Sequence, residues 1–112
     1  MAKRRCTCPA DETLELISGR WKVPILWELF QAKRRFSELR RLLGEACGQK
    51  VLTQQLREME RNGLVSRNIY PQVPPKVEYS LTEVGASLQP VVEAMCRWGE
   101  LHGDRHSAET GR

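Results

Sequence analysis

The sequence predicts a mainly α-helical domain with one small antiparallel β hairpin, a fold of the α+β class. Apolar residues recur at helical spacing over most of the chain. Strict alternation occurs only in two short runs between residues 65 and 81, and a proline-rich segment separates these runs. With 112 residues, 40% hydrophobic and 29% charged, the chain fits one domain, residues 1–112. We expect a basic arm at residues 1–7 and a polar tail that frays at residues 103–112.

Three helices are expected in the first part of the chain. The first begins near Cys8 and Pro9, because proline is favoured in the first turn, and ends near Gly19. The second carries Pro24 in its first turn and is apolar on nearly every side, so we expect it to be buried in the middle of the domain. Ser37 is expected to cap the third helix.

A fourth helix is expected over residues 49–62, with Gly63 ending it. Leu52, Leu56 and Met59 share one face and should anchor the helix to the core. The opposite face is polar. Its residues are Lys50, Thr53, Gln54, Arg57 and Arg61.

The alternating runs follow this helix and predict two paired strands. Residues 71–75 contain three prolines, which cannot donate ladder hydrogen bonds, so they should form a rigid loop at the hairpin tip. Thr82 then caps a last helix with a long apolar stripe, and Pro90 inside that helix implies a local kink.

The third and fourth helices together form a helix-turn-helix, and the hairpin after them adds a wing. In such a motif the second helix lies in the major groove of DNA, where its polar side chains meet base edges. The residues expected to read bases are Gln49, Thr53, Gln54 and Arg57. Those expected to contact phosphates are Arg34, Arg35, Lys50, Arg61, Arg67 and Lys76.

Charge supports this interpretation. The net charge is +4, and residues 33–41 contain five basic residues and one acidic residue. An isolated run of this kind is usually a solvated helix face, but this run directly precedes the expected recognition helix. A winged-helix module that binds another protein is the alternative, and it would lack the steep salt dependence of DNA binding.

The last helix carries more apolar surface than so small a domain needs, which favours a homodimer over a cover for the monomer core. The residues expected at the dimer interface are Leu14, Leu88, Val91, Met95 and Trp98. A two-fold dimer would present two recognition helices to a palindromic double-stranded DNA operator.

The chain resembles the HxlR family of winged helix-turn-helix transcription regulators. The matching segments are residues 8–9, 19–22, 25–29, 35–39, 50–59, 63–67 and 73–82. The resemblance implies a homodimer built from the N- and C-terminal helices, binding to palindromic operators, and a role as repressor or activator. It also implies that the cysteine at position 8 can sense oxidants, quinones or aldehydes. The chain departs from the usual family pattern at Cys47 and Gly48, where Gly48 weakens the cap of the recognition helix.

Cys8 is the candidate redox sensor. It lies at a predicted helix N-terminus near Arg4 and Arg5, and both features favour the reactive thiolate. An inert N-terminal cysteine is the alternative. The second thiol of a disulfide would be Cys6, Cys47 or Cys96, although Cys47 and Cys96 also fit core positions.

Other functions are less well supported. Cys6, Cys8, His102 and His106 offer zinc-type ligands, and a metal-responsive regulator is therefore an alternative, but the cysteine spacing is tighter than usual and the histidines lie in the polar tail. The sequence contains none of the common catalytic motifs, so we expect neither an enzyme nor a cofactor. With no signal peptide and no membrane-spanning run, we expect a cytoplasmic protein that does not bind membranes.

Overall fold

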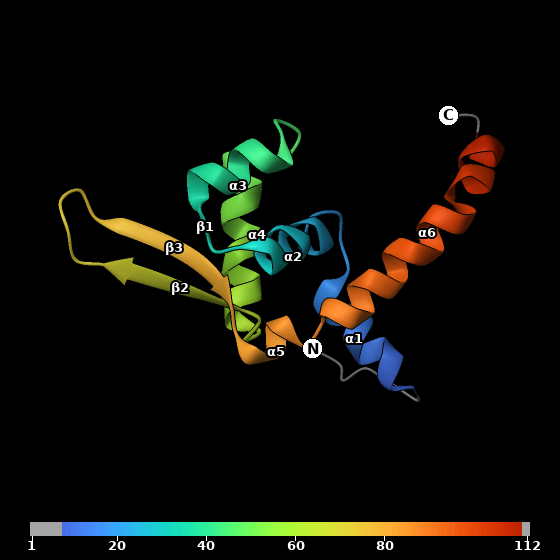
Figure 1. Ribbon diagram of the computed structural model, residues 1–112, viewed down its shortest axis with the longest axis horizontal. Helices are drawn as coiled ribbons and strands as arrows, with labels where there is room; N and C mark the ends of the chain where they lie inside the picture. Colours follow the sequence, from blue (N-terminus) through green and yellow to red (C-terminus); the bar gives the residue numbers. More distant parts are fainter. Residues whose placement is uncertain (1–7, 111–112) are drawn as a thin grey trace.

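A computed structural model describes residues 8–110, with side chains described through Gly103. These residues form a helical body with a β hairpin projecting from one side and a long C-terminal helix leaving the other (Figure 1). The elements in chain order are α1 (Pro9–Ile17), α2 (Lys22–Gln31), β1 (Arg34–Arg35), α3 (Phe36–Leu43), α4 (Gln49–Arg61), β2 (Val65–Tyr70), β3 (Lys76–Leu81), α5 (Glu83–Ala86) and α6 (Gln89–Thr110). The predicted α+β class is confirmed.

The sheet has three antiparallel strands in the order β1-β3-β2. The hairpin register runs from Val65 opposite Leu81 to Tyr70 opposite Lys76, so residues 71–75 form the tip as expected. The sequence did not reveal β1, because two residues are too few to show any alternation. Through β1, the chain between α2 and α3 is joined to the wing.

The core lies where α2 meets the other helices and the sheet, as predicted for a helix apolar on most sides. Ile25 and Leu26 are fully buried and Leu29 nearly so. Helix α2 contacts α3, α6 and β3. The other fully or almost fully buried side chains are Leu39, Cys47, Leu52, Leu56, Met59, Leu64 and Val92.

Two expected helix boundaries are wrong. Helix α3 begins at Phe36, one residue before the expected cap Ser37. Its N-cap is Arg35, whose backbone N–H donates to Glu38 Oε1 at 2.7 Å. Because Glu38 supplies the acceptor at the helix start, no hydroxyl cap is needed there.

The expected single last helix is two helices. Thr82 caps the short α5, and its hydroxyl accepts a hydrogen bond from the Gly85 amide at 3.0 Å. Helix α6 begins at Gln89, so Pro90 lies in its first turn rather than kinking its interior. A proline there removes no intrahelical hydrogen bond, so the physical reason for the expected kink does not apply at this position.

Helix α6 continues to Thr110, through much of the segment expected to fray, and that fraying stays a prediction. The basic arm, residues 1–7, lies outside the described residues. None of the helices in residues 8–110 combines the length and apolar character needed to cross a bilayer.

Candidate nucleic-acid interface

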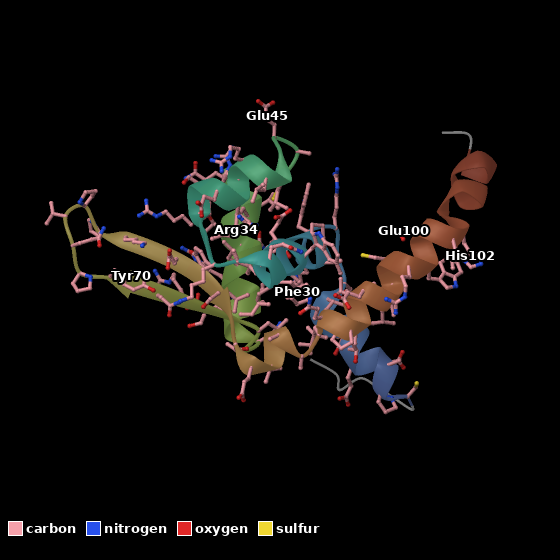
Figure 2. All side chains as sticks on the ribbon, viewed as in Figure 1. Phe30, Arg34, Glu45, Tyr70, Glu100 and His102 are labelled. Carbon is pink, nitrogen blue, oxygen red and sulfur yellow. The ribbon has the colours of Figure 1, made fainter. Side chains whose placement is uncertain are left out.

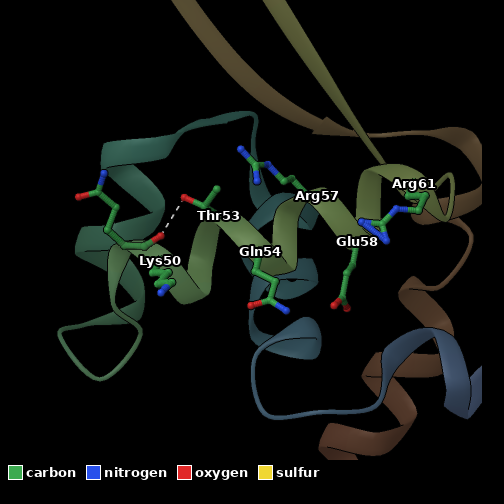
Figure 3. A pocket seen from close by; sticks show the side chains of 7 residues that line it. Lys50, Thr53, Gln54, Arg57, Glu58 and Arg61 are labelled. Carbon is green, nitrogen blue, oxygen red and sulfur yellow. Dashed lines mark hydrogen bonds between the residues drawn. The ribbon is translucent and has the colours of Figure 1, made fainter.

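Helix α4 presents a polar face that is anchored from behind. Leu52, Leu56 and Met59 are at most 1% exposed and fix the helix to the core. Gly63, at φ +79°, ends the helical segment in a conformation that favours glycine. A shallow hollow of about 740 Å³ runs along the outer face (Figure 3). Its lining consists of Gln49, Lys50, Thr53, Gln54, Arg57, Glu58 and Arg61.

All four predicted base-reading residues therefore lie on one surface. Gln49, Gln54 and Arg57 are exposed. Thr53 is half-buried and its hydroxyl donates to the Gln49 carbonyl at 2.8 Å, which leaves its oxygen able to accept. Figure 3 shows Arg57 directed toward the strands and Gln54 toward the opposite side, so the polar face extends to both sides of the helix.

A buried lysine supports this helix, and sequence reasoning missed it. Lys22 opens α2 and is 8% exposed. Its ammonium donates to Gln55 Oε1 at 2.8 Å and to Glu58 Oε1 at 2.7 Å. The hydrogen bond from Lys22 and its positive charge hold the pKa of Glu58 below its usual value. The sequence did offer one signal of this contact: Lys22 stands in the first turn of a helix that is otherwise expected to be buried, and a buried lysine needs a partner.

The cationic side chains predicted to contact phosphates differ in their exposure and in the partners they already have. Arg35, Lys50 and Arg61 are exposed. Arg34 is half-buried, and it donates to the Glu28 carbonyl and to Glu28 Oε1, both at 3.4 Å. Its guanidinium is thus engaged with α2.

The two remaining cationic residues lie on the wing. Arg67 Nε is 3.8 Å from Glu60 Oε2, with both side chains well exposed. Lys76 Nζ is 3.5 Å from Glu78 Oε2 and 5.2 Å from the centre of the Tyr70 ring. Ion pairs of this length at a surface are weak, so both cations can exchange their carboxylate for a phosphate.

The apolar stripe of α6 is exposed beyond the point where the helix leaves the body. Val91 is 39% exposed, Met95 43% and Trp98 64%. Leu14 on α1 is 53% exposed. Leu88, also expected at a dimer interface, is 8% exposed and belongs to the core. Leu101 is 79% exposed and extends the apolar surface, which sequence reasoning did not include.

The far end of α6 lies across the molecule from the wing, as the positions of His102 and Tyr70 in Figure 2 show. The His102 ring stacks on Trp98, with centroids 4.3 Å apart. Within the described residues, no three histidine, cysteine or acidic side chains are grouped to hold a metal. Cys6 and the side chain of His106, both weighed as ligands, lie outside the described residues.

The three cysteines in the described part of the chain occupy different environments. Cys8 is exposed at the N-cap of α1, as expected for a sensor. Cys47 is fully buried, and burial raises the pKa of its thiol against the opposing effect of Arg40 and Arg20. Cys96 is exposed on α6, whereas its apolar neighbours in the sequence favoured a core position.

A helix-turn-helix with a polar second helix, followed by a hairpin and flanked by terminal helices, defines a winged helix-turn-helix protein. A family model described as HxlR-like helix-turn-helix matches residues 16–107, and the chain belongs to that family. The chain is 51% identical over 98 residues to the HTH-type transcriptional regulator YdeP of Bacillus subtilis, covering 88% of this chain and 76% of YdeP.

Solved structures agree with this assignment. The reduced form of the redox regulator HypR matches with a TM-score of 0.84 and 46% identity, covering 90% of this chain and 99% of HypR. Diamide-treated YodB from B. subtilis matches with a TM-score of 0.73 and 34% identity, covering 85% of this chain and 94% of YodB. The chain is thus an HxlR-type transcription regulator and not an enzyme.

Proposed function

We propose that this regulator binds double-stranded DNA in the cytoplasm as a homodimer, with helix α4 of each protomer in the major groove of a palindromic operator. The observation that carries the proposal is the exposed polar face of α4, held outward by three buried apolar residues. An α-helix fits the major groove, where each base pair offers a distinct set of donors and acceptors.

The proposed roles follow from exposure and chemistry. Base edges are read by Gln49, Thr53, Gln54 and Arg57. Glutamine can pair bidentately with adenine and arginine with guanine. Phosphates are bound by Arg35, Lys50, Arg61, Arg67 and Lys76, while Arg34, held by Glu28, contributes mainly its charge.

The first experiment selects an operator from a random duplex library and then compares variants on it. We expect Gln54→Ala to cost roughly 1–3 kcal/mol on the selected operator and to relax preference at one base pair. Lys50→Ala, the matched control on the same face, should weaken all sequences alike and lower the salt slope by about 1. Equal loss on every sequence for Gln54→Ala would contradict a base-reading face.

Salt also separates DNA binding from a protein-interaction module. Binding to phosphates releases counterions, so the affinity for DNA should fall steeply as salt rises. Binding that hardly changes between low and physiological salt would favour a protein partner instead.

The same proposal includes a thiol switch at Cys8. The support is the exposed position of Cys8 at the start of α1 and the likeness to HypR, titled a redox regulator, and to YodB, solved after diamide treatment. In the proposed step, Cys8 and a second thiol lose two electrons and two protons to the oxidant and form a disulfide. Cys96 is the exposed thiol among the candidates that the structure describes, and Cys47 is the buried one.

The switch is tested by measuring DNA binding before and after diamide. We expect Cys8→Ser to bind the operator as the unmodified chain does, and to lose the diamide response. Cys96→Ser and Cys47→Ala then test the two candidates for the second thiol, since the exposed Cys96 is open to the oxidant and the fully buried Cys47 is not in this conformation. If Cys8→Ser still responds to diamide, Cys8 is not the sensor.

A further inference from the structure

A small cleft lies between α4 and the wing, beside the polar face already described. It has a volume of about 180 Å³, enough for a few water molecules and therefore for one phosphate group. Its lining comes from helix α4 and from the hairpin that follows it. Thr53, Arg57 and Glu60 belong to α4, and Arg67 and Tyr79 belong to the hairpin.

The sheet register brings the wing residues together. Arg67 on β2 lies directly opposite Tyr79 on β3, and Arg34 on β1 lies opposite the same tyrosine. Directly opposed residues point to the same face of a sheet, so Tyr79 stands between two arginines. Arg34 is engaged with Glu28, whereas Arg67 reaches toward α4 and lies 3.8 Å from Glu60.

Helix α4 supplies the opposite wall. Arg57 is directed toward the strands, on the side of α4 away from Gln54 (Figure 3). The cleft therefore holds two guanidinium groups and one carboxylate, which gives it a net charge of +1.

Tyr79 adds a neutral donor. Burial raises the pKa of its hydroxyl, with Arg67 and Arg57 acting in the opposite direction and Glu60 in the same direction. The hydroxyl therefore stays protonated near neutral pH. Donors from three side chains around a positively charged hollow suit a ligand with several anionic oxygens, and do not suit a cation or an apolar group.

We propose that this cleft holds one backbone phosphate of the bound DNA, with Arg67 and Tyr79 donating to its non-bridging oxygens and Arg57 closing the α4 side. The inference rests on the proposed DNA binding and adds Tyr79 as a ligand. Arg57 has five N–H donors, so one edge of its guanidinium can meet the phosphate while another faces a base.

Glu60 has a defined part in this arrangement. In the DNA-free protein its carboxylate lies beside the Arg67 guanidinium, where its negative charge repels an entering phosphate. Glu60 thus competes with DNA for the same cation. Removing its charge should strengthen DNA binding, because the Arg67 guanidinium is then no longer partly neutralised.

The first test measures the affinity and salt slope of full-length variants on a mixed-sequence duplex of roughly 30 base pairs, long enough for two half-sites. Phosphate contacts do not depend on sequence, so no operator is needed. We expect Arg67→Ala to raise Kd about tenfold and to lower the salt slope by about 1. Tyr79→Phe should raise Kd roughly threefold to tenfold without changing the slope, since it removes one hydrogen bond and no charge.

Matched controls separate the cleft from general effects. Tyr70→Phe removes the other tyrosine hydroxyl of the wing, and Arg97→Ala removes an exposed charge on α6. Both should leave Kd within about twofold, a change near the size expected at a site without specific contacts. Glu60→Gln should lower Kd severalfold. A loss in Tyr70→Phe equal to that in Tyr79→Phe would overturn the proposal.

A second test locates the phosphate. On a selected operator, each phosphate in turn is replaced by an uncharged methylphosphonate. The unmodified chain should lose affinity at one position in each half-site where Arg67→Ala loses much less and Tyr79→Phe somewhat less, because each variant has already lost part of that contact. Additive losses at every position would overturn the assignment.

The outcomes distinguish the two proposals. If the unmodified chain binds no DNA, the proposed function fails. If it binds DNA and Arg67→Ala matches it in Kd and slope, the cleft proposal fails together with the phosphate role of Arg67, while DNA binding through α4 stands. A free anion is the other occupant to be tested.

The test compares thermal stability of the DNA-free chain in sodium phosphate and in sodium chloride at equal ionic strength. If phosphate stabilises the chain saturably and Arg67→Ala abolishes this effect, the cleft binds a free anion instead.

Discussion

Lys22 shows how one side chain can hold the DNA-facing helix in place. Its ammonium lies 2.7 Å from Glu58 Oε1 and joins the start of α2 to the middle of α4. The side chain of Lys22 is 10% exposed, against 34% for Glu58, so the lysine is the buried partner. Losing the carboxylate would leave a buried cation poorly compensated, which is more costly than losing a surface pair.

This pair predicts a pH dependence. Because the pKa of Glu58 is lowered in the folded protein, the pair stabilises the fold above the unfolded pKa of about 4.3. That contribution is lost as the pH falls through the lower folded pKa. We expect Lys22→Met to reduce the free energy of unfolding at pH 7, and to do so much less at about pH 3.

The measurement is urea unfolding of the unmodified chain and Lys22→Met across this pH range. Lys33→Met, at an exposed lysine just after α2, is the control and should differ little at any pH. A stability difference for Lys22→Met that is the same at both pH values would show that the methylene packing of Lys22, and not its charge, supports α4.

At the level of elements, the sequence predicted the helices and strands whose apolar residues recur at a regular spacing. It missed the features that only a few tertiary contacts define. The apolar stripe of α4 and the alternation of the hairpin recur several times, and both elements occur where expected. The two-residue strand β1 has no period, so only its pairing with β3 defines it. The break before α6 is likewise invisible to periodicity, because the apolar spacing continues across it.

Tertiary contacts explain why the helix is interrupted between α5 and α6. The Thr82 hydroxyl donates to the Gly63 carbonyl at 2.5 Å and accepts from the Gly85 amide. A Cβ at Gly85 would overlap the Leu64 carbonyl oxygen, so α5 packs tightly on the start of β2. The residues of the candidate interface divide likewise into those that periodicity predicted and those that only tertiary contacts bring together. The face of α4 followed from periodicity, whereas the Lys22 pair joins two helices that are not consecutive, and the cleft brings Tyr79 of β3 beside α4.

At the scale of the whole molecule, α6 extends away from the body and carries apolar side chains with it (Figure 1). Val91, Met95 and Trp98 are each more than a third exposed, and Leu14 of α1 is a further exposed apolar side chain. An exposed apolar stripe of this extent is typical of an interaction surface. A second copy is the occupant that matches the two-fold symmetry of a palindromic operator.

This homodimer predicts the effect of a charge on the stripe. Met95→Glu should leave the monomer folded, because Met95 is 43% exposed, and should separate the protomers by placing a carboxylate in an apolar interface. Two linked half-sites are bound far more tightly than one, so we expect affinity for a palindrome to fall about 100-fold while affinity for a single half-site changes little. Arg97→Ala changes the net charge by the same one unit roughly 200° around the helix, and should remain dimeric. Sedimentation analysis measures the oligomeric state of each variant, and DNA titrations measure its affinity. If Met95→Glu remains dimeric, the dimer interface does not lie on this face of α6.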